Sequence, residues 1–108
     1  MVLVPFPFDD LTGSKVRPAV CLTDPVGPYR HVVLAFVTSR DPDDLVETDV
    51  RLDPGRPDFP NTGLRVPSTL RTHRLMTVST SLIVRELGVL SPTLQSLVAR
   101  KLRALFGF

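Results

Sequence analysis

The chain has 108 residues, 43% of them hydrophobic and 22% charged, so it is long enough for one domain with a single core. This composition excludes wholesale disorder, and no stretch reaches the ~20 apolar residues that a membrane-spanning helix needs. The formal net charge is only +2, but all except two of the 13 basic residues are arginine. Arginine is suited to bidentate phosphate contacts, although a compositional bias of the genome explains the excess equally well.

Two features indicate where the protein works. The N-terminus lacks the basic region and the small-residue cleavage site of a signal peptide. The single cysteine, Cys21, lies in an apolar run and has no second cysteine with which to form an internal disulfide. We therefore expect a cytoplasmic protein with no membrane association, in which residues 1–108 form one domain.

Residues 2–22, VLVPFPFDDLTGSKVRPAVCL, predict a strand, an exposed loop and a second strand. Pro5 and Pro7 place the first strand at a sheet edge or near its own end, because proline lacks a ladder donor. The polar residues 9–15 are typical of a loop. Arg17 follows where this loop meets the second, apolar strand, and such a junction suits a functional side chain.

The middle of the chain predicts further strands. Residues 31–37 are an apolar run, which is typical of a strand buried on both faces. Residues 46–52 alternate between apolar and polar side chains, which predicts a strand with one solvent-exposed face. Residues 53–63 are rich in proline and glycine and form a loop that is a candidate for partner contact. Residues 64–78 are predicted to be mostly extended.

Two helices are predicted near the C-terminus. Residues 80–87 favour a short helix that Gly88 ends. A longer helix begins with Ser91 as its cap and Pro92 at its first position. Its apolar stripe consists of Leu94, Leu97, Val98, Leu102 and Leu105. The whole pattern predicts a mainly β protein with α, built as a small, strongly bent antiparallel sheet or barrel on which the helix packs.

The residue types alone indicate little chemistry. Two histidines and one cysteine, widely separated, do not form a zinc site, and we expect no metal and no cofactor. The acidic pairs Asp9–Asp10 and Asp43–Asp44 fall on turns, and we interpret them as solvated.

A family resemblance extends this interpretation. The stretch VLVPFPFDDLTGSKVRPAVCLTD resembles the opening of the PemK/MazF family of type II toxin endoribonucleases. Residues 34–39, LAFVTS, resemble the family's strand that ends in Thr-Ser, and residues 81–91 with the following helix resemble its C-terminal segment. The similarity spans nearly the whole chain in the same order.

The resemblance implies a fold, an activity and partners. The fold is an SH3-like barrel of the CcdB/PemK/MazF type with a C-terminal helix, and the protein works as a homodimer. The activity is metal-independent cleavage of single-stranded RNA at short sequences, leaving 2′,3′-cyclic phosphate and 5′-hydroxyl ends. A small cognate antitoxin protein holds it inactive. The resemblance implies that Arg17 corresponds to the family's catalytic arginine and Thr38 to its catalytic threonine.

Proton transfer and RNA contacts complete the expected site. Some family members carry a glutamate in the loop before the arginine, and others carry an Arg-x-Asp pattern on a later strand. In this chain, His73 stands at the position of the aspartate in the Arg-x-Asp pattern. We predict that His73 serves as general acid or base on the same strand face as Arg71. The residues expected to contact RNA are Ser14, Lys15, Ser39, Arg40 and Arg71.

Two alternatives keep the fold and change the activity. A CcdB-like toxin poisons gyrase without nuclease activity, but that activity depends on a C-terminal tryptophan, and this chain has none. A catalytically inactive interaction module is the other alternative. It is favoured by the first strand's start at Met1 and by the missing acidic residue.

Overall fold

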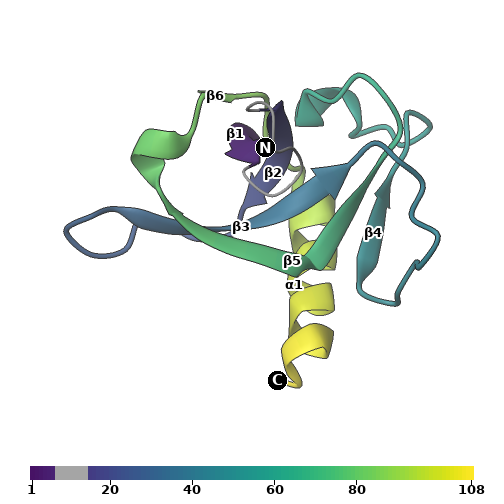
Figure 1. The fold of residues 1–108 in the computed structure, drawn as a ribbon. Coiled ribbons are helices and arrows are strands. Elements are labelled where there is room, and N and C mark those ends of the chain that lie inside the picture. The colour runs from purple at the N-terminus through teal and green to yellow at the C-terminus, as the bar shows by residue number, and fades with distance from the viewer. Residues whose placement is uncertain (7–14) are drawn as a thin grey trace.

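The computed structural model describes the backbone of residues 1–6 and 15–108. Within these residues, six strands form one antiparallel sheet in the order β4-β5-β3-β2-β1-β6, and one long helix lies across it (Figure 1). The elements are β1 (Val2–Phe6), β2 (Lys15–Cys21), β3 (His31–Thr38), β4 (Asp49–Leu52), the 3-10 helix η1 (Pro60–Thr62), β5 (Ser68–Ser79), the 3-10 helix η2 (Thr80–Leu82), β6 (Arg85–Glu86) and α1 (Pro92–Phe106). The predicted class, mainly β with one C-terminal helix, is confirmed.

The long strand β5 bends in its middle and gives the sheet its curvature (Figure 1). Ala35 of β3 pairs with Leu75, whereas Val37 of β3 pairs with Leu70. Between these two pairs, β5 therefore contains more residues than β3 does. Such a bulge bends a strand and re-aims its side chains. The extra residues of β5, 71–74, therefore lie out of register with β3 at the end of the sheet where the candidate site forms.

The apolar side chains pack in two clusters. One joins the sheet to α1 and includes Leu52, Leu70 and Leu94, all buried. The other lies over β1, β2 and β3 and includes Val4 and Leu34. Among the described helices, none is long and apolar enough to cross a membrane.

The C-terminal helix begins where the sequence predicts. The Ser91 hydroxyl accepts a hydrogen bond from the Leu94 amide, and Pro92 occupies the first position. At the other end, Gly107 has a φ of 75°, a left-handed conformation that glycine adopts without strain.

The predicted helix over residues 80–87 is wrong. Only Thr80–Leu82 is helical, as one 3-10 turn, and the chain then becomes extended. The Val84 amide donates to the Leu3 carbonyl at 2.8 Å, and β6 pairs with β1 from there. This pairing satisfies backbone groups that a helix would have satisfied locally, so the contact with β1 overrides the local preference.

The predicted strand over residues 46–52 begins later than expected, at Asp49. Its first residues instead form a turn, because the Asp49 amide donates to the Val46 carbonyl and the Asp49 carboxylate accepts from the Val46 amide, both at 3.0 Å. A carboxylate that binds the backbone of its own loop favours a turn over an extended ladder.

Two glycines let the loop after β4 pack directly against the backbone that precedes α1. A Cβ atom on Gly88 would lie 2.2 Å from the Asn61 carbonyl oxygen, and one on Gly63 would lie 2.1 Å from the Leu87 carbonyl oxygen. Both separations are far below van der Waals contact. The Val89 amide also donates to the Asn61 carbonyl at 2.8 Å. The loop is therefore fixed against the start of the helix.

An ion pair in the same loop extends to the helix cap and makes stability depend on pH. Arg56 Nε lies 2.9 Å from Asp58, and the Ser91 hydroxyl donates to Asp58 at 2.6 Å. The Arg56 hydrogen bond, followed by that from Ser91, lowers the pKa of Asp58 to about 2. The pKa of Asp58 is thus lower in the folded state than in the unfolded state. The stabilisation is therefore complete above about pH 4 and is lost as the pH falls through about 2.

We accordingly expect the wild-type protein to have a higher free energy of unfolding than Asp58→Asn. This difference is expected to be larger at pH 5 than at pH 2. Denaturant unfolding of both proteins across this range, followed by circular dichroism, measures the difference. A difference that stays constant across the range would contradict the assignment.

Candidate nucleic-acid interface

A groove of about 570 Å³ opens where the ends of β2 and β3 meet the bulge of β5 and residues 63–66. Its lining contains the basic residues Lys15, Arg17, Arg40, Arg65, Arg71, Arg74 and Arg85. No aspartate or glutamate lines it among the residues that the structure describes. A cleft lined by one sign of charge concentrates ions of the other sign, so this groove suits an anionic chain.

Arg17 and Thr38 line this groove from neighbouring strands. In the β2–β3 pairing, Ala19 lies opposite Phe36. Arg17 comes two residues before Ala19 on β2, and Thr38 comes two residues after Phe36 on β3. Both residues line the groove, so neighbouring strands bring a guanidinium and a hydroxyl to the same cleft.

The Thr38 hydroxyl is oriented by the turn that follows β3. The Arg40 backbone amide donates to Thr38 Oγ1 at 3.2 Å. This bond uses an acceptor position of the oxygen and leaves the hydroxyl hydrogen for donation to another group. Ser39 and Arg40 lie in the same exposed turn, and both line the groove, as does Lys15.

Arg71 also lines the groove, but its side chain is buried and has acidic partners. Its Nε donates to Asp49 Oδ1 at 3.0 Å, and its Nη1 donates to Asp44 Oδ1 at 3.0 Å. Nη2 donates to the Asp44 backbone carbonyl at 3.2 Å. The hydrogen bond from Arg71 lowers the pKa of the Asp44 carboxyl. Asp44 is exposed, as its interpretation as solvated predicts, and its carboxylate also binds Arg71.

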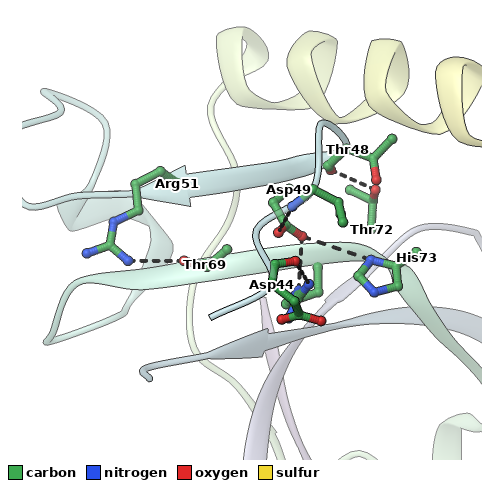
Figure 2. Close-up of polar contacts among 9 residues, drawn as sticks. Asp44, Thr48, Asp49, Arg51, Thr69, Thr72 and His73 are labelled. Atoms are coloured by element: carbon green, nitrogen blue, oxygen red, sulfur yellow. Dashed lines mark hydrogen bonds and ion pairs between the residues drawn. The ribbon is translucent and has the colours of Figure 1, made fainter. Parts of the chain in front are cut away.

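His73 lies beside this network and is not among the residues that line the groove. Its Nδ1 is 3.9 Å from Asp49 Oδ1, and Asp44, Asp49 and His73 lie together in Figure 2. Arg71 and His73 thus share a carboxylate, as alternation along one strand face predicts. The acid–base role of His73 stays a prediction. Ser14, expected to contact RNA, lies outside the described residues.

Three of the groove arginines were missed by sequence reasoning. Arg74 enters the groove from the β5 bulge, which has no local sequence signal. Arg85 lies in the stretch that was assigned to a helix, and Arg65 lies in the loop before β5. The one available signal was the excess of arginine over lysine, which gives no positions.

The fold is shared with solved structures of mycobacterial proteins. The Mycobacterium tuberculosis toxin MazF-mt6 superimposes with a TM-score of 0.69 at 20% sequence identity, covering 100% of this chain and 98% of the other. An endoribonuclease in complex with its cognate antitoxin, from mycobacterial species, gives a TM-score of 0.62 at 15% identity, covering 99% and 92%. These likenesses define the class of fold.

The sequence identifies the family within that class. Residues 1–106 match the family model described as the PemK-like, MazF-like toxin of type II toxin–antitoxin systems. The chain belongs to this family. The search of curated protein sequences gave no match.

Proposed function

We propose that this protein is a toxin endoribonuclease that cleaves single-stranded RNA without a metal ion. The observation that carries the proposal is that Arg17 and Thr38 line one groove, together with further arginines and, among the described residues, no carboxylate. An open basic groove fits a single strand better than a deep pocket would. Family membership supports the same activity.

The reaction follows from the chemistry of RNA. The ribose 2′-oxygen attacks the adjacent phosphorus, a new O–P bond forms, and the bond to the 5′-oxygen of the next nucleotide breaks. Negative charge builds on the non-bridging oxygens in between. The Arg17 guanidinium offers two donors to these oxygens, and the Thr38 hydroxyl offers a third. The products are a 2′,3′-cyclic phosphate and a 5′-hydroxyl.

The 2′-hydroxyl must lose a proton and the leaving 5′-oxygen must gain one. We propose His73 for one of these transfers, because imidazole is suited to proton transfer near neutral pH. His73→Ala is then expected to lower the cleavage rate by about 100-fold and to change the pH–rate profile. Single-turnover cleavage between pH 5 and 8 measures both, and an unchanged rate across that range would remove His73 from the mechanism.

Incubation of the purified protein with a long single-stranded RNA in EDTA tests the proposed function. Discrete fragments that end in cyclic phosphate support it. Intact RNA together with inhibition of gyrase supports the CcdB-like alternative. The absence of both RNA cleavage and gyrase inhibition supports an inactive module of the same fold.

The proposal includes partners. A cognate antitoxin is supported by family membership, and one of the solved structures is itself a complex with an antitoxin. A homodimer is proposed from the family, and the cytoplasm is the proposed location because RNA is found there. A small acidic protein encoded beside this chain, co-purifying with it and abolishing RNA cleavage, would support this assignment.

A further inference from the structure

Residues 41–48, which form most of the connection between β3 and β4, are an acidic strap beside the groove. At its start, the Asp41 carboxylate lies 2.9 Å from Arg51 Nη1. At its end, the Thr48 carbonyl accepts a hydrogen bond from the Thr72 hydroxyl at 2.8 Å (Figure 2). The acidic strap is therefore fastened to β4 and β5 on both sides of Asp44.

Arg71 is bound by two carboxylates that differ in their exposure to solvent. The Asp49 side chain is only 4% exposed and lies opposite Arg71 in the β4–β5 pairing. The Asp44 side chain is 78% exposed and comes from the acidic strap. A buried ion pair is costly to break, whereas an exposed one contributes little and exchanges readily with other anions. Asp49 therefore fixes Arg71, and Asp44 is the partner that can be displaced.

Arg71 connects the acidic strap to the groove. Its three side-chain nitrogens each donate to Asp44 or Asp49, and the residue is also part of the groove lining. Asp44 therefore occupies guanidinium donors of Arg71 that could otherwise contact phosphate. Carboxylate and phosphate oxygens compete for a guanidinium because both accept the same pair of parallel N–H bonds.

We propose that Asp44 is an intrachain competitor of RNA, whose carboxylate is displaced from Arg71 by a phosphate of the bound strand while Asp49 keeps Arg71 in place. This inference rests on the proposed function, because it takes the occupant of the groove to be single-stranded RNA. The acidic strap then lowers RNA affinity, and binding of the strand releases it at Asp44.

Binding of a non-cleavable oligonucleotide tests the inference. The probe is a short fluorescent single strand with randomised bases and 2′-O-methyl ribose, which lacks the attacking hydroxyl. Asp44→Asn is expected to bind it about two- to fivefold more tightly than wild type near 50 mM salt. The slope of log Kd against log salt is expected to steepen by up to about 0.7, the value for one phosphate contact on a single strand.

Asp43→Asn is the matched control, because it removes the same charge from the adjacent residue. Asp43 is not among the groups that bind Arg71 in the described part of the chain. Its effect on affinity is expected to be smaller than that of Asp44→Asn. Asp44→Ser, which also removes the reach of the side chain, provides a second variant.

A double variant without the buried ion pair shows whether the gain in probe affinity depends on Arg71. Arg71→Gln combined with Asp49→Asn removes both buried charges together, so neither is left unpaired. In that background, Asp44→Asn is expected to change affinity no more than Asp43→Asn does. Two results would overturn the inference. One is a gain in probe affinity from Asp44→Asn that persists in the Arg71→Gln and Asp49→Asn background. The other is Asp44 variants that bind the probe no more tightly than Asp43→Asn. Failure of the wild-type protein to bind the probe at low salt would instead overturn the proposed function, and the inference with it.

Discussion

Arg17→Ala is expected to lower the single-turnover rate of RNA cleavage by about 100- to 1000-fold, the usual effect of removing one preorganised donor from a developing oxyanion. Arg17, on β2, lines the groove together with Thr38 of β3. Its guanidinium would stabilise charge that exists only in the transition state. The loss should therefore appear in the rate at saturating RNA more than in binding.

Arg100→Ala provides the matched control for this prediction. Arg100 is exposed on α1 and is not a groove residue, yet its substitution removes the same charge. We expect cleavage by this variant to stay within about twofold of wild type. Similar losses in both variants would mean that Arg17 acts through overall charge. Retained cleavage in Arg17→Ala would exclude it from the chemistry.

Gly88→Ala is expected to lower the free energy of unfolding by about 2–4 kcal/mol. The new Cβ atom would lie 2.2 Å from the Asn61 carbonyl oxygen and 2.7 Å from the Thr62 carbonyl carbon. Both are backbone atoms, so no side chain can rotate away to make room. The loop before β5 and the segment before α1 must then separate.

Gly55→Ala isolates the effect of this close contact. Both substitutions reduce the freedom of the unfolded chain in the same way, but a Cβ atom on Gly55 meets nothing within 4 Å. Its effect on stability is expected to stay within about 0.5 kcal/mol. Urea denaturation of the two variants beside wild type gives the comparison. Equal stabilities for the two variants would contradict the structural explanation.

Local sequence patterns predicted the elements whose stability is largely local. The apolar run of β3 and the cap of α1 at Ser91 are examples, because hydrophobic periodicity and capping chemistry act within a few residues. Strand β6 was not predictable in this way. Its extended conformation depends on Leu3, which is distant in the sequence but adjacent in the sheet.

The candidate site divides along the same line. Arg17 was predicted from its place near the junction of a loop and a strand, whereas Thr38 was predicted only from the family resemblance. The groove position of Arg74 follows from a register shift between β3 and β5, which a single sequence does not encode in any short pattern. The contact between Asp44 and Arg71 likewise joins a turn to a strand that is far away in the sequence.

The glycine contact between the loop and the start of α1 has a consequence for local unfolding. The groove wall at residues 63–66 follows directly after the loop that Asp58 joins to Ser91, the cap of the helix. We therefore expect the wall and the first turn of α1 to open together, as one cooperative unit for amide hydrogen exchange. A ligand that holds the wall in place would slow exchange at the Leu94 amide, on the far side of the contact and outside the groove.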